Sequence, residues 1–137
     1  MAWWLIKSEP FKYSWDMMVA DGRTHWDGIR NHQAALNLKA MAVGDNAFFY
    51  HSNEGKEIVG IVAIVRTAYP DPGDSAGRFV MVDVEAAAPV PIPVTLAAMK
   101  AVPELAEFGL IRQSRLSVVP VSDDHYRVVA AMARLVS

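Results

Sequence analysis

The chain has 137 residues, of which 53% are hydrophobic, and this size and composition predict one globular domain with a buried core. It has no cysteine, which excludes disulfide frameworks and thiolate metal sites. The formal net charge of −2 argues against a protein that coats DNA by neutralising phosphates, because such proteins carry clustered Lys and Arg in excess. A domain that binds a single extruded nucleotide needs few positive charges facing the nucleic-acid backbone, and it is therefore compatible with a net charge of −2.

The first part of the chain predicts one strand and two short helices. Residues 3–7 are aromatic and apolar and predict a strand, which Ser8-Glu9-Pro10 ends. Ser14 is a typical N-cap for a helix that runs through Ala20. Apolar residues at helical spacing predict a second helix over residues 31–41.

The middle of the chain predicts three strands. Residues 47–51 and 58–68 are rich in apolar, aromatic and β-branched side chains, and residues 53–56 join them as a hairpin connection. Gly60 inside the second of these strands favours a bulge or a close backbone approach. After a loop rich in Pro and Gly, alternation of side chains predicts a further strand over residues 79–84.

The last third predicts short elements of mixed type. Residues 86–93 contain too many prolines for a central strand. A helix capped by Thr95 is expected over residues 96–101, and a turn that Gly109 ends is expected over residues 103–109. A strand over residues 116–121 and a last helix over residues 122–135 follow. Because strands and helices intermingle without regular βαβ alternation, we expect an α+β domain with a curved, largely antiparallel sheet or a small barrel.

Four polar clusters lie where predicted elements end, which is where binding groups commonly sit on a rigid scaffold. They are Lys7-Ser8-Glu9, the stretch from Trp26 to Gln33, Tyr50-His51-Ser52-Asn53, and Arg112-Gln113-Ser114-Arg115. An indole can stack on a nucleobase, and Asp, Asn and Gln side chains can recognise the edge of the base by its donors and acceptors.

Each cluster also has a simpler interpretation. Lys7 and Glu9 lie on the same side of an extended chain and could form a surface ion pair. Trp26 could be an ordinary core residue, and His51 could bond to a loop carbonyl. The arginines of the last cluster could be solvated surface charges.

Metal, cofactor and membrane signatures are absent from the sequence. No i,i+4 helical pair and no Cys partner occurs among His25, His32, His51 and His125. Neither a Gly-rich phosphate loop nor a Gly-x-Ser-x-Gly elbow occurs, so we expect no metal and no cofactor. No apolar run reaches about 20 residues and the N-terminus lacks the pattern of a signal peptide, so we expect a cytoplasmic protein that does not contact membranes. The sequence does not determine the oligomeric state, for which a monomer is the default expectation.

Ordered motifs run along nearly the whole chain: Trp4-Leu5-Ile6-Lys7-Ser8-Glu9-Pro10, Trp26-Asp27-Gly28-Ile29-Arg30-Asn31, Gln33-Ala34 with Asn37, Val43-Gly44-Asp45, Phe48-Phe49-Tyr50-His51-Ser52-Asn53, Ile58-Val59-Gly60-Ile61, Ala68-Tyr69-Pro70-Asp71, Val82-Asp83-Val84, Arg112-Gln113-Ser114-Arg115-Leu116-Ser117-Val118 and Pro120-Val121. Through this set the chain resembles the EVE domain family, a branch of the PUA-like superfamily, as a stand-alone bacterial member. The resemblance implies one domain over residues 1–137, with a mixed, mostly antiparallel curved sheet that forms a pseudobarrel surrounded by short helices.

The resemblance also implies a pocket for a modified base, by kinship with YTH domains, which recognise methylated adenine in RNA. EVE relatives are associated with modified cytosines in DNA. The implied base-binding residues are Lys7, Ser8 and Glu9 at the pocket edge, Trp26 as one wall, Asp27, Arg30 and Asn31 as the rim, and Tyr50, His51, Ser52 and Asn53 opposite. Arg112, Gln113 and Arg115 are expected to face the nucleic-acid backbone. The candidates for a second aromatic wall are Tyr50, Tyr69 and Phe79.

We therefore expect a non-catalytic module that binds a modified base, either 5-methylcytosine in DNA or a modified base in RNA. The alternative is an amidohydrolase that acts on an acylated nucleoside, as in related ASCH-type proteins, with Lys7 as amine or general base and Glu9 as its acid partner. A third interpretation is an interaction adaptor that binds a protein and no small ligand.

Overall fold

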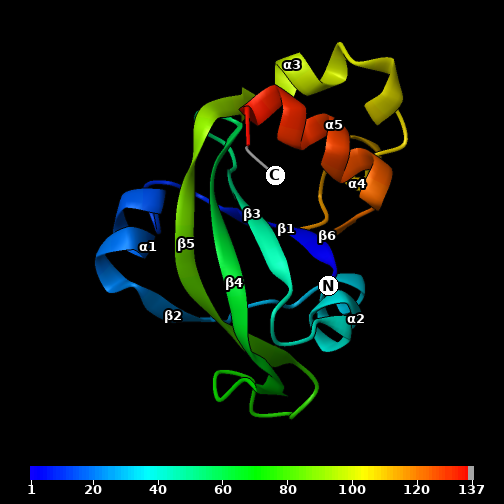
Figure 1. Cartoon of the computed structure of the whole chain (residues 1–137). Coiled ribbons are helices and arrows are strands. Elements are labelled where there is room, and N and C mark those ends of the chain that lie inside the picture. Colours follow the sequence, from blue (N-terminus) through cyan, green and yellow to red (C-terminus); the bar gives the residue numbers. More distant parts are fainter. Residues whose placement is uncertain (136–137) are drawn as a thin grey trace.

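A single six-stranded sheet organises the chain, which the computed structural model describes over residues 1–135. The strands are β1 (Trp3–Ser8), β2 (Arg23–Trp26), β3 (Asn46–His51), β4 (Glu57–Pro70), β5 (Val80–Thr95) and β6 (Val118–Val121). The helices are α1 (Trp15–Asp21), α2 (His32–Ala40), α3 (Leu96–Lys100), the 3-10 turn η1 (Pro103–Leu105), α4 (Gly109–Arg112) and α5 (Asp123–Ala133). Figure 1 shows the long β4–β5 hairpin crossing the molecule, with the 71–79 loop at its lower end and α3 at its upper end.

The strand order is β2-β5-β4-β3-β1-β6, and every neighbouring pair is antiparallel except β1 with β3. This confirms the expected α+β class and the mixed, mostly antiparallel sheet. Over residues 1–135 the edge strands β2 and β6 do not pair with each other, so the sheet curves without closing into a barrel.

Side-chain caps fix where the helices begin. Ser14, Asn31, Thr95 and Ser122 each accept a hydrogen bond from the backbone N–H three residues further on. Such a cap satisfies one of the N–H groups that a helix leaves without a partner in its first turn. The starts of α1, α3 and α5 therefore confirm the predictions made from their capping residues, and α2 begins next to the position predicted from apolar spacing.

Gly60 marks both a bulge and a close approach, as its position within a strand predicted. The pairing of β4 with β5 shifts register between Ile58 and Gly60. A Cβ on Gly60 would lie 2.5 Å from ring carbons of Trp15, which is closer than van der Waals contact allows. The absence of a side chain at this position lets α1 pack directly on the sheet.

The proline-rich segment agrees with its expectation, whereas Gly109 and β2 do not. Residues 86–93 were expected to be too rich in proline for a central strand, and they lie in the edge part of β5, which continues to Thr95. Prolines are tolerated there because β2 pairs only with residues 82–85 of β5, so the rest of β5 is an edge that needs no N–H donor. Gly109 begins α4 instead of ending a turn, and a Cβ there would lie 2.6 Å from Val119. The short strand β2 was not foreseen.

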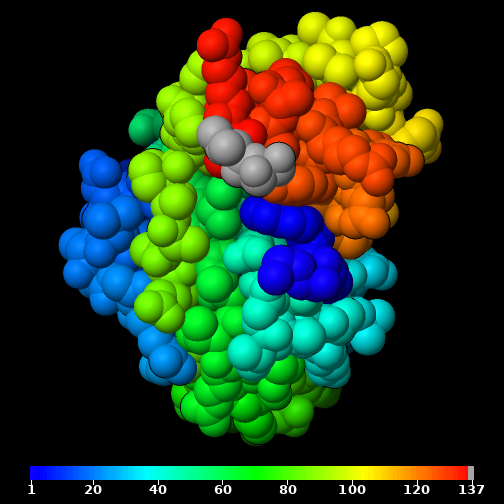
Figure 2. Space-filling view, in the orientation of Figure 1, coloured from blue at the N-terminus to red at the C-terminus, as the bar shows by residue number. Residues whose placement is uncertain are grey.

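The core lies between the sheet and its helices, where Phe48, Phe49 and Phe108 are fully buried. Trp3 stacks on Tyr126 of α5 with ring centroids 4.3 Å apart, which ties the first strand to the last helix. Figure 2 shows the N-terminal residues seated between the α2 segment and the C-terminal helix. Within residues 1–135, no helix is long and apolar enough to cross a membrane.

Candidate functional site

The ends of β1 and β2 enclose a cavity of about 410 Å³, here called the β1–β2 cavity. Its lining residues are Lys7, Ser8, Glu9, Lys12, Tyr13, Thr24, His25, Trp26, Asp27 and Ile29. Three strands separate β1 from β2 in the sheet order, so the curvature of the sheet brings their ends together. Of the base-binding residues named from sequence, the cavity gathers Lys7, Ser8, Glu9, Trp26 and Asp27.

Trp26 and Tyr13 supply aromatic ring surface to the β1–β2 cavity. Trp26 is 7% exposed and packs edge-on against Phe49, with ring centroids 5.6 Å apart. Tyr13 meets Trp26 at a steep angle of 70°, with centroids 6.2 Å apart. The Tyr13 hydroxyl donates to Asp21 over 2.7 Å, and burial together with this hydrogen bond raises the pKa of Tyr13 to about 12. Tyr13 therefore stays protonated and keeps a fixed orientation.

Tyr13 was not among the aromatic residues considered from sequence for the second wall. The structure places Tyr69 beside Asp83, to which its hydroxyl donates, with the Arg66 guanidinium 3.5 Å from its ring centroid. Phe79 lies beside Arg30, 5.4 Å from its guanidinium. Tyr13 precedes the Ser14 cap in a short turn after β1, and no sequence pattern linked it to Trp26.

The polar side chains at the end of β1 all have partners. Lys7 Nζ donates to the Ser114 carbonyl over 2.8 Å, and burial lowers the pKa of Lys7. Glu9 accepts a hydrogen bond from Asn53 at 2.8 Å and pairs with Lys12 at 3.2 Å. Lys7 and Glu9 therefore form no ion pair with each other in the described part of the chain. This arrangement does not favour the enzyme alternative, which needs the two groups to act together.

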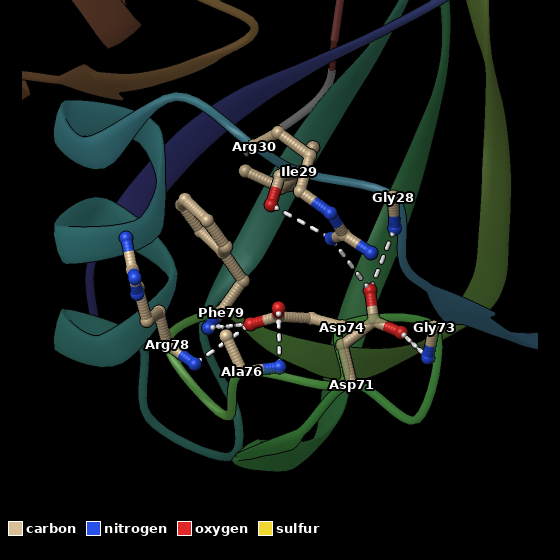
Figure 3. Close-up of polar contacts among 9 residues, drawn as sticks. All are labelled: Gly28, Ile29, Arg30, Asp71, Gly73, Asp74, Ala76, Arg78 and Phe79. Atoms are coloured by element: carbon tan, nitrogen blue, oxygen red, sulfur yellow. Dashed lines mark hydrogen bonds and ion pairs between the residues drawn. The ribbon is translucent and has the colours of Figure 1, made fainter.

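A buried carboxylate holds the segment that follows Trp26 (Figure 3). Asp71 is 3% exposed and accepts hydrogen bonds from the N–H groups of Gly28 (2.9 Å) and Gly73 (2.8 Å) and from the Arg30 guanidinium (3.0 Å). The Gly28 bond, with help from Gly73 and Arg30, holds the pKa of Asp71 below its usual value. Arg30, expected at the pocket rim, thus anchors the loop beside the β1–β2 cavity and does not line it.

A second carboxylate orients a histidine at the cavity. Asp83 Oδ1 lies 2.9 Å from Nδ1 of His25, and the Tyr69 hydroxyl donates to the same oxygen. Burial opposes the charged form of Asp83, but the hydrogen bonds from His25 and Tyr69 outweigh it and lower its pKa. His25 was missed from sequence because the strand β2, which sets its register opposite Asp83, was not foreseen.

The cluster at the end of β3 divides between two roles. The Nε2 atom of His51 accepts the N–H of Trp15 over 3.0 Å, and burial lowers the pKa of His51, so this histidine supports the start of α1. Tyr50, Ser52 and Asn53 line a second cavity of about 300 Å³. We call this second cavity the lysine cavity, and its complete lining is Lys7, Tyr50, Ser52, Asn53, Lys56, Leu96, Lys100, Leu110 and Ser114.

The residues expected to face a nucleic-acid backbone line a third, shallower hollow of about 370 Å³, together with Asn31 and Gln33. In this hollow Arg112 is already paired with Glu107 at 2.7 Å, whereas Arg115 forms no ion pair within residues 1–135. The Asn31 side chain caps α2. Across the described residues, no group of three or more His, Asp or Glu side chains is arranged to hold a metal ion.

Comparison with known proteins identifies relatives that match half or more of this chain. Thymocyte nuclear protein 1 of Danio rerio is 31% identical over 163 residues, covering 94% of this chain and 71% of that protein. Thymocyte nuclear protein 1 of Gallus gallus is 48% identical over 80 residues, which cover 50% of this chain. The match spans only 33% of the length of the Gallus gallus protein.

Solved structures agree with this relationship. An NMR structure of a Rhodopseudomonas palustris protein has a TM-score of 0.94 and 54% identity, covering 100% of this chain and 96% of that one. The human THYN1 protein, solved in complex with 5-methylcytosine-containing DNA, has a TM-score of 0.90 and 29% identity, with 100% of both chains covered. The model of the EVE domain matches residues 2–132. The chain therefore belongs to the EVE domain family.

Proposed function

We propose that the protein binds a modified cytosine of DNA, without catalysis, by taking the base into the β1–β2 cavity. The observation that carries this proposal is the human THYN1 structure, which matches the whole chain and contains 5-methylcytosine DNA. The cavity provides a second, independent argument. Its volume of about 410 Å³ lies within the range of about 300–1,000 Å³ that is typical of ligand pockets.

The lining of the β1–β2 cavity suits a flat ligand with a polar edge. Trp26 and Tyr13 offer apolar ring surface, and stacking of one base on an aromatic ring contributes about 1–3 kcal/mol. Asp27 lies in the exposed segment at the cavity mouth and can accept from the exocyclic amine of cytosine, a donor that carboxylates commonly recognise. His25, held by Asp83, supplies a further polar group.

The energetics predict weak binding to duplex DNA. Extruding a base from the duplex costs a few kcal/mol. Stacking on Trp26 and Tyr13 and hydrogen bonds to the edge of the base together contribute little more than this cost. We therefore expect a duplex affinity that is micromolar or weaker. Single strands and nucleotides avoid the extrusion step and should compete well.

The test is a titration by fluorescence anisotropy of two labelled single strands that differ only in one 5-methylcytosine. The proposal predicts tighter binding of the methylated strand and a loss of about tenfold or more in Trp26→Leu, because the stacking surface is removed. Leucine is chosen because Trp26 is nearly buried and alanine would leave a core cavity. Trp3→Leu is the matched control, since Trp3 stacks on Tyr126 and lines neither cavity.

Equal affinity for both strands, or equal binding by Trp26→Leu and the wild type, would refute the proposal. A thermal melt of each variant establishes that it is folded at the temperature of the titration.

A further inference from the structure

The lysine cavity is strongly one-sided in charge. Three of its lining residues are lysines, Lys7, Lys56 and Lys100, and none of its lining residues carries a carboxylate. Lys56 and Lys100 are exposed and form no ion pair within residues 1–135. Lys7 spends one of its three N–H donors on the Ser114 carbonyl and keeps two. Such a concentration of donors attracts an anion.

Tyr50 provides an independent sign of a ligand. Its side chain is 97% buried, being only 3% exposed, yet within the described residues its hydroxyl forms no hydrogen bond with the protein. No fully enclosed polar side-chain atom in this part of the chain lacks a partner, so the Tyr50 hydroxyl must reach solvent. The opening that Tyr50 lines is the lysine cavity. A hydroxyl that has no partner within the described residues and belongs to a side chain lining a cavity can donate to a bound group.

The lysine cavity adjoins the β1–β2 cavity. Lys7 lines both of them. Behind this shared side chain, the Ser52 N–H donates to the Ser8 carbonyl over 2.9 Å and the Asn53 amide donates to Glu9 over 2.8 Å, which fixes the two linings against each other. A ligand in the β1–β2 cavity therefore lies next to the lysine cavity, with Lys7 in the lining of both.

We propose that the lysine cavity binds a phosphate group of the nucleotide whose base occupies the β1–β2 cavity. This inference rests on the proposed function. Ammonium groups and hydroxyls are the donors that phosphate oxygens accept, and a charged acceptor makes each such bond stronger than a neutral one. The nearby base cavity selects a nucleotide phosphate over other anions, because one ligand then satisfies both sites at once.

The experiment compares the affinities of 5-methyl-2′-deoxycytidine and of its 3′- and 5′-monophosphates, measured by calorimetry on the full chain. We expect one of the two monophosphates to bind at least about tenfold tighter than the nucleoside, because its charged phosphate would accept hydrogen bonds that the nucleoside lacks. Lys100→Ala and Tyr50→Phe should reduce that ratio while leaving the affinity for the nucleoside unchanged. Lys39→Ala, which removes one exposed lysine of α2 outside both cavities, should leave the ratio intact.

A methylated single strand provides the second readout. If the cavity holds a phosphate, the slope of log affinity against log salt should fall by about 0.7 in Lys100→Ala, the loss of one phosphate contact on a single strand. Nucleoside binding with no gain from either monophosphate, or an equal loss of nucleoside and monophosphate affinity in Lys100→Ala, would overturn the phosphate inference alone. Failure of all three ligands and of the methylated strand to bind would refute the proposed function and the inference with it.

Discussion

Replacing Asp71 by asparagine tests how the segment beside the β1–β2 cavity is held in place. One oxygen of Asp71 accepts the Gly28 N–H and the Arg30 guanidinium, and the other accepts the Gly73 N–H. Asparagine has nearly the same shape but only one acceptor oxygen. If that oxygen keeps Gly28 and Arg30, the new NH₂ group faces the Gly73 N–H, donor against donor.

The expected loss of unfolding free energy is about 3 kcal/mol. Hydrogen bonds to a charged group contribute about 1.5–3 kcal/mol each. The bond from Gly73 is lost outright, and the bonds from Gly28 and Arg30 keep an acceptor that is no longer charged. Breaking a buried ion pair costs about 3–5 kcal/mol of unfolding free energy. The Arg30 side chain is 41% exposed, so solvent screens its interaction with Asp71 and the expected loss lies at the lower end of this range. For a domain of 137 residues this corresponds to a fall in Tm of roughly 10 °C.

Thermal melts of both proteins between pH 3 and pH 7 would check the magnitude and its cause. Because the pKa of Asp71 is lowered in the folded state, its contribution is present above the usual value of 3.8 and is lost as the pH falls through the lowered value. The gap between wild type and Asp71→Asn should therefore narrow in acid. A gap that is below about 1 kcal/mol at pH 7, or that does not change with pH, would refute the reasoning.

Asp74→Asn is the matched control for the effect on binding. Asp74 caps the same loop by accepting the N–H groups of Ala76, Arg78 and Phe79, and within residues 1–135 no hydrogen bond or ion pair joins its side chain to Gly28 or Arg30 (Figure 3). Asp71→Asn should weaken binding of the methylated strand because the segment after Trp26 loses its anchor. Asp74→Asn should bind that strand as the wild type does.

Three further predictions concern the scaffold. Gly60→Ala should destabilise the fold by about 1–3 kcal/mol in denaturant melts, because its Cβ would lie 2.5 Å from Trp15, and no loss would show that the helix can shift freely. The lowered pKa of His51 means that its neutral form stabilises the fold above pH 6.5, and this contribution is lost as the pH falls through the lowered value. In His51→Gln the unfolding free energy should therefore depend less on pH near pH 6, and an unchanged pH dependence would show that His51 does not contribute in this way. Asn37→Leu should cost about 1–3 kcal/mol in the same melts, because the buried Val118 carbonyl loses its 2.7 Å donor; an unchanged midpoint would show that the bond is dispensable.

Local signals in the sequence predicted most of the elements. Ser14 and Ser122 begin helices because their hydroxyls compete well for the first N–H groups, and this depends on a few neighbouring residues. Gly60 was interpretable for the same reason, since a glycine within a strand implies a nearby obstacle. The prolines of β5 indicated correctly that residues 86–93 are no central strand. That they form an edge strand could not be predicted, because this depends on which strand lies alongside, and β2 is remote in sequence.

The composition of the candidate site was only partly predictable. Lys7 and Trp26 share the β1–β2 cavity because the sheet curves, and no spacing along the chain encodes that curvature. Tyr50 was grouped with Trp26 from sequence, but parallel pairing of β1 with β3 places it across from Lys7 in the lysine cavity. Tyr13 gave no signal at all, because its proximity to Trp26 depends on the turn between β1 and α1.

The most direct test of the central claim is to follow the indole N–H signals of the four tryptophans by NMR during titration with 5-methyl-2′-deoxycytidine monophosphate. We predict a saturable shift of the Trp26 signal, with the Trp3 signal unchanged because Trp3 stacks on Tyr126 of α5 and lines neither the β1–β2 cavity nor the lysine cavity. Saturable binding that leaves the Trp26 signal in place and instead shifts the backbone signals of Arg112 to Arg115 would contradict it, because the nucleotide would then occupy the third hollow and not the β1–β2 cavity.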